Sequence, residues 1–153
     1  EMTSKEQIEK QELKDREEVI KLFNTIFKDV KYTSLPISAT TDITVTATTT
    51  GNCTGIYNVE IKERNVPIDR FNDCFLEVMK HDSLKSTYTD HRPLYIALYP
   101  SSRTACVWSF KFIDMSEIKQ EKRWMNKSTF CDTEKVLKDV YIMPLSIAKQ
   151  YKY

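Results

Sequence analysis

Glycine is scarce in this chain: only Gly51 and Gly55 occur among its 153 residues. A glycine-rich loop that wraps a phosphate needs several residues free to adopt positive φ, so this scarcity argues against such a loop. Long hydrophobic runs are also absent, and none reaches the length of a membrane-spanning helix. The polar N-terminus shows no secretory signal pattern, and we expect Met2, after Glu1, to be the natural start.

Closely spaced metal-ligand pairs are missing as well. None of the four cysteines belongs to a Cys-x-x-Cys pair, and the two histidines, His81 and His91, lack the spacing of zinc ligands. The chain is longer than most disulfide scaffolds. We therefore expect reduced thiols and a cytoplasmic protein, with no zinc ribbon and no Ser/His/Asp or Cys/His catalytic motif. The cysteines are Cys53, Cys74, Cys106 and Cys131.

The overall charge is close to neutral. The net charge is +1, and the 29% charged and 41% hydrophobic residues are typical of a globular protein. A near-neutral chain is not expected to coat DNA, but it can hold an acidic metal site with basic residues around it. The length suits one domain, so we predict a single domain over residues 1–153.

The first predicted element is a helix over residues 4–27. Ser4 and Gln7 form a capping-box pattern at its start. When the apolar face is extended backwards, Arg16 and Glu12 fall on it. Either the polar first half projects beyond the domain, or these charges have a function. The apolar residues at the spacing of one buried face are Val19, Ile20, Phe23, Ile26 and Phe27.

The rest of the chain predicts strands and two further helices. Residues 41–49 and 55–64 flank turn residues, so we expect them to form a β-hairpin. The later strands are apolar on both faces, which is typical of strands covered by helices. This order predicts an α/β fold of α+β character, with a central mixed β-sheet flanked by helices. The other predicted elements are an extended segment over 30–38, a helix over 69–84 with Phe71, Phe75, Val78 and Met79 facing inward, strands over 94–99 and 105–112, a helix over 116–124 and an extended segment over 136–145.

One group of charged residues predicts a function. Side chains alternate along a strand, so Glu60 and Lys62 share one face while Ile61 packs on the other. A hairpin would bring Asp42 back alongside them. Carboxylate oxygens hold Mg²⁺ or Mn²⁺, a metal-bound water is a nucleophile near neutral pH, and a lysine can orient it. The backbone carbonyl of Ile61 could be a further metal ligand.

These residues resemble the signature of the PD-(D/E)xK nuclease superfamily. The match consists of Asp42 followed by the triplet Glu60, Ile61, Lys62, and it extends over residues 12–108. Thr41 stands where the family usually has proline. The resemblance implies a restriction-endonuclease-like core, a Mg²⁺ (or Mn²⁺) cofactor, DNA as substrate and 5′-phosphate products. It also implies a first-helix glutamate in the site, for which Glu12 fits best and Glu17 and Glu18 are alternatives.

We therefore expect a metal-dependent DNA endonuclease, with branched or phage DNA among the candidate substrates and a homodimer as a candidate assembly. Three alternatives stay open: Glu60 and Lys62 on an ordinary solvated strand face, a non-catalytic nucleic-acid or protein binding module on the same fold, and a nuclease that cuts RNA.

Other charged and aromatic residues are assigned structural roles. Glu77 and Lys80 are expected to form a surface ion pair, although Lys80 could instead reach DNA. His81 is expected on a helix surface and His91 in a loop. The two tryptophans, Trp108 and Trp124, are expected in the core or at its edge. Basic residues around Trp124 predict a solvated helix face or a phosphate-contact patch: Lys119, Lys122, Arg123 and Lys127.

Overall fold

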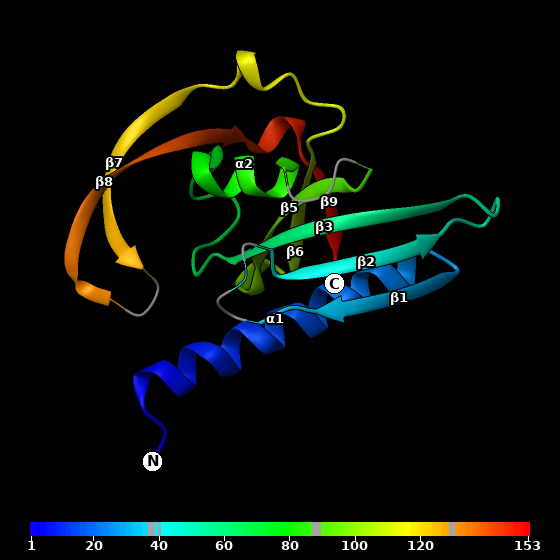
Figure 1. Ribbon diagram of the computed structural model, residues 1–153, viewed down its shortest axis with the longest axis horizontal. Coiled ribbons are helices and arrows are strands. Elements are labelled where there is room, and N and C mark those ends of the chain that lie inside the picture. Colours follow the sequence, from blue (N-terminus) through cyan, green and yellow to red (C-terminus); the bar gives the residue numbers. More distant parts are fainter. Residues whose placement is uncertain (37–38, 40, 87–89, 129–130) are drawn as a thin grey trace.

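A mixed six-stranded sheet is the main element of the computed structural model, which describes residues 1–36, 39, 41–86, 90–128 and 131–153. Its strand order is β1-β2-β3-β5-β6-β9, and a separate three-stranded sheet has the order β4-β8-β7 (Figure 1). Two α-helices lie in the described part of the chain. The protein is therefore α+β with a mixed central sheet, as predicted. Neither helix is long and apolar enough to cross a membrane.

Helix α1 (Ser4–Ile26) agrees closely with the first predicted element. Its capping box lies one residue earlier than predicted: the Thr3 hydroxyl accepts from the Glu6 N–H, and the Glu6 carboxylate accepts from the Thr3 N–H. The second half packs on the sheet, although Ile26 at its end is 40% exposed. The residues buried on this face are Val19, Ile20, Leu22 and Phe23.

Strands β2 (Ile43–Thr48) and β3 (Thr54–Glu63) form the predicted hairpin. Strand β1 (Asp29–Ser34) pairs with the outer edge of β2. The turn contains Asn52 at a φ of 64°, a left-handed conformation that asparagine tolerates better than most residues. The register sets Ile43 opposite Val59, so Asp42 is placed where the β2–β3 ladder begins.

Strand β5 (Arg92–Tyr99) lies in the middle of the sheet, parallel to β3 and antiparallel to β6 (Thr104–Ser109). Strand β9 (Lys149–Lys152) forms the edge next to β6. The even-numbered apolar residues of β5 pack with α1, and the odd-numbered ones pack in a second cluster on the opposite face. This explains why the segment is apolar on both faces. Helices do not cover both faces as predicted, because the residues that cover the second face come largely from the other sheet, such as Leu76 and Met143, together with Leu84 of a helix.

The helix predicted over residues 69–84 is wrong in its first half. Residues Asp73–Glu77 form strand β4, and α2 covers only Val78–Ser86. Phe71 and Met79, predicted to face inward, are 56% and 81% exposed. Cys74 and Leu76 alternate instead as the buried face of a strand that pairs with β8.

The helix predicted over residues 116–124 is also wrong. After a 3₁₀ turn at Met115–Glu117, the chain forms β7 (Gln120–Ser128), which pairs with the long strand β8 (Cys131–Pro144). This hairpin curves away from the central sheet (Figure 1). Trp124 on β7 is 71% exposed, whereas Trp108 is fully buried, as predicted for a core residue. The predicted basic stretch therefore lies along an exposed strand and not on a helix.

Candidate functional site

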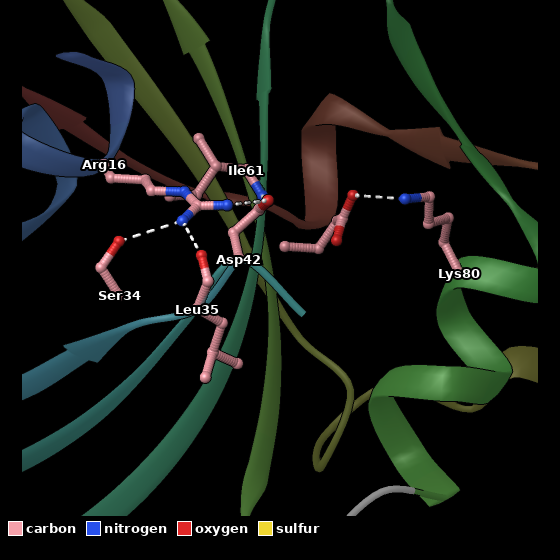
Figure 2. A network of polar contacts seen from close by, with 7 residues as sticks. Arg16, Ser34, Leu35, Asp42, Ile61 and Lys80 are labelled. Carbon is pink, nitrogen blue, oxygen red and sulfur yellow. Dashed lines mark hydrogen bonds and ion pairs between the residues drawn. The ribbon is translucent and has the colours of Figure 1, made fainter. Parts of the chain in front are cut away.

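The Asp42 carboxylate is held beside β3, directly before β2 begins. Its own N–H donates to the Val59 carbonyl at 3.1 Å, which continues the hairpin ladder by one residue. Its Oδ2 accepts a hydrogen bond from the Ile61 N–H at 2.7 Å (Figure 2). The hairpin thus brings Asp42 alongside the triplet of residues 60–62, which is the arrangement expected from the sequence.

Arg16 of α1 holds the other oxygen of this carboxylate. Its Nη2 lies 3.2 Å from Asp42 Oδ1, and its Nη1 donates to the Ser34 hydroxyl at 3.0 Å and to the Leu35 carbonyl (Figure 2). The side chain of Arg16 is only 5% exposed. A projecting, polar first half of the helix therefore does not explain Arg16: its charge is buried against Asp42. No role for Arg16 was predicted, although its place on the apolar face of the helix was the available signal.

Glu60 points to the opposite side of β3 from Ile61 and meets α2. Its Oε1 lies 3.6 Å from Lys80 Nζ, and its side chain is only 12% exposed, so it does not stand on a solvated strand face. Burial raises the pKa of Glu60 to about 8, and the neighbouring charge of Asp42 adds to the rise, while Lys80 and Lys62 oppose it. Burial is therefore the main cause of the raised pKa of Glu60, and the charge of Asp42 is a smaller one.

Lys62 follows Glu60 on the same face of β3 and is one of the more exposed residues of the site. Partial desolvation of its ammonium lowers the pKa of Lys62, and the nearby Arg64 cation lowers it further; Glu77 and Glu60 act in the opposite direction. Lys62 is thus within electrostatic reach of Glu60, with which it shares a face of β3.

Glu12 of α1 lies within electrostatic reach of this group. It is half-buried, and burial together with the charge of Asp42 raises the pKa of Glu12, while Arg16, Lys80 and Lys62 lower it. The alternatives are less suitable, since Glu18 pairs with Lys21 at 3.7 Å and Glu17 is exposed.

The donor chemistry of the site fits a hard divalent cation. In the described ranges, no group of three or more His, Cys, Asp or Glu side chains is arranged to hold a metal ion. Mg²⁺, however, is commonly held by one or two carboxylates together with waters and substrate phosphates. Asp42 and Glu60 could provide such a pair. The Ile61 carbonyl points to the same strand edge as its N–H, and therefore towards Asp42.

Three charged residues behave differently from their sequence predictions. His81 is not a surface residue: it is 5% exposed, its ring packs edge-on against Phe110 and Tyr141, and burial lowers its pKa. Lys80 forms its ion pair with Glu60, and Glu77 forms one with Lys138 at 2.8 Å. The predicted pairing of residues 77 and 80 required one continuous helix, but Glu77 is the last residue of β4.

The chain matches no family model, no curated protein and no solved structure at a significant level. The fold and the site define an α+β protein in which an acidic pair and two lysines lie where β2 begins and β3 ends. Each acid is paired with a cation from a different helix.

Proposed function

We propose that this protein is a metal-dependent DNA endonuclease of the PD-(D/E)xK type, with a restriction-endonuclease-like core. The observation that carries the proposal is the hydrogen bond from the Ile61 N–H to the Asp42 carboxylate, because it joins the two separated parts of the motif. The element order supports it: α1 and β1 precede the β2–β3 hairpin, β4 and α2 follow it, and β5 then runs parallel to the strand that carries the triplet.

The residues of the site have distinct roles under this proposal. Asp42 and Glu60, with the Ile61 carbonyl, hold Mg²⁺ or Mn²⁺. The bound cation supplies charge stabilisation at the phosphate and a water of lowered pKa. Lys62 orients the attacking water or neutralises the charge that develops on the phosphate oxygens. Glu12 assists from α1, and Arg16 keeps the Asp42 carboxylate in place.

The reaction is hydrolysis of a phosphodiester bond. The water oxygen bonds to phosphorus, the bond from phosphorus to the 3′ oxygen breaks, and the departing oxygen takes up a proton. The products are a 5′-phosphate and a 3′-hydroxyl. We place the activity in the cytoplasm, with branched or phage DNA as candidate substrates. Cutting both strands of a duplex would require a homodimer, because one domain provides one site.

The test is incubation of the protein with linear, single-stranded and branched DNA, in Mg²⁺ and in EDTA. We expect cleavage only with Mg²⁺, and a loss of at least about a hundredfold in Lys62→Ala. Lys31→Ala, which removes an exposed lysine from β1, is the matched control and should cleave like the parent. Equal cleavage by the parent and Lys62→Ala would refute the catalytic role of Lys62 and the mechanism that depends on it.

Two further outcomes would select the alternatives. A parent protein that binds no Mg²⁺ or Mn²⁺ would favour the non-catalytic binding module. Faster cleavage of RNA than of any DNA would support the same catalytic site but make RNA the substrate.

A further inference from the structure

Each of the two acids of the site is paired with one cation, and the two cations differ in exposure. Arg16 pairs with Asp42, and its guanidinium is also bound by Ser34 and the Leu35 carbonyl. Lys80 pairs with Glu60 across 3.6 Å, and its side chain is 42% exposed. Arg16 is therefore locked in place, whereas Lys80 is a flexible point charge with solvent beside it.

We propose that Lys80 is a displaceable cation that stands in for the metal at Glu60 and then binds a phosphate of the nucleic acid. The inference rests on the proposed function. In it, Lys80 couples metal binding to nucleic-acid binding. A divalent cation on Glu60 would repel an ammonium at 3.6 Å, so the two compete for the same carboxylate. The released lysine would then be free to bind a phosphate of the nucleic-acid backbone.

The packing of α2 allows this exchange without movement of the helix. Leu84 is fully buried and His81 nearly so, and both fix the helix against the protein body. Only the four-carbon stem of Lys80 needs to rotate. An ammonium binds phosphate as a point charge and does not need the fixed geometry of a guanidinium fork.

The test separates metal binding from nucleic-acid binding. Lys80→Met keeps the length of the side chain and removes its charge. Without DNA and at mildly alkaline pH, we expect this variant to bind Mn²⁺ about tenfold more tightly than the parent, because a competitor and a like charge are gone. In Ca²⁺, used in place of Mg²⁺ to slow cleavage, binding of a short DNA duplex should weaken about tenfold, and its salt dependence should fall by about one counterion.

Two controls make the result specific. Lys85→Met, which removes an exposed lysine from the same helix, should change neither affinity by more than about twofold. In a Glu60→Gln background, Lys80→Met should no longer tighten Mn²⁺ binding, since the carboxylate for which the two cations compete is gone. Lys80→Arg should retain most of the DNA affinity.

Each outcome either supports or overturns the inference. Suppose that the parent binds Mn²⁺ and cleaves DNA, but Lys80→Met binds Mn²⁺ equally well or more weakly. This result overturns the competition between Lys80 and the metal and leaves the proposed function standing. Tighter Mn²⁺ binding with unchanged DNA affinity overturns the phosphate contact. A parent that binds no Mn²⁺ removes the proposed function together with this inference. A thermal unfolding curve for each variant shows whether it is folded.

Discussion

A carboxyl pair between α1 and the end of β3 should make the stability of this protein depend on pH. Asp15 is 8% exposed, and Gln11 Nε2 donates to Asp15 at 3.0 Å and to Glu63 at 2.6 Å. Burial raises the pKa of Asp15 to about 7, and Glu63 adds to the rise. The folded protein therefore binds a proton that the unfolded chain releases at lower pH. The stabilisation is complete below the unfolded pKa near 3.8 and is lost as the pH rises through about 7.

The size of the effect follows from this shift. A rise from 3.8 to about 7 corresponds to at most about 4 kcal/mol. Glu63 lies near the surface and can turn towards water, so we expect about 1–2 kcal/mol. Asp15→Asn resembles the protonated acid: its oxygen still accepts from Gln11, and its amide can donate to Glu63. The variant should be more stable than the parent by about 1–2 kcal/mol at pH 8 and equally stable at pH 4.

Urea unfolding of the parent and Asp15→Asn at several pH values measures this difference directly. Glu17→Gln removes an exposed acid from the same helix and should show no pH-dependent gain. The reasoning fails if Asp15→Asn is less stable than the parent at pH 8, or if its advantage does not shrink between pH 8 and pH 4.

Two further predictions concern the site and the core. Arg16→Met should cost about 3 kcal/mol of unfolding free energy, because it leaves the Asp42 carboxylate without its cation, and the loss should be smaller in an Asp42→Asn background. A urea-unfolding cycle measures both values, and a loss below about 1 kcal/mol would contradict the role assigned to Arg16. Trp108→Ala should cost about 3–5 kcal/mol because the side chain is fully buried, whereas Trp124→Ala should stay within about 0.5 kcal/mol. Similar losses for both tryptophans would contradict the exposed position of β7.

The hairpin that carries the triplet could be predicted because its signals are local. Strand-forming residues on both sides of a turn favour pairing between neighbouring segments. Alternation along β3 then places Glu60 and Lys62 on one face without any knowledge of the remaining fold. The position of Asp42 follows from the same pairing, and the hydrogen bond to Ile61 agrees with it.

The first half of the helix predicted over residues 69–84 is wrong because the strand there pairs with a distant part of the chain. The spacing of Phe75, Val78 and Met79 fits a helix, whereas the alternation of Cys74 and Leu76 fits a strand. In so short a segment, the local sequence does not distinguish the helical period of about 3.6 residues from the strand period of two. Pairing with β8 decides between them, since Leu76 lies opposite Tyr141. The helix predicted over residues 116–124 is wrong for a different reason: this segment pairs with the next strand in a hairpin, in which Trp124 lies opposite Leu137.

The amino-acid sequence by itself determined the first helix, the hairpin and the common face of Glu60 and Lys62, because periodicity and turn chemistry act between near neighbours. Only the tertiary structure decided which cations meet the acids. Arg16 and Lys80 come from two helices that pack on different sides of the site. Such contacts depend on how whole elements pack, and the spacing of residues within an element does not contain that information.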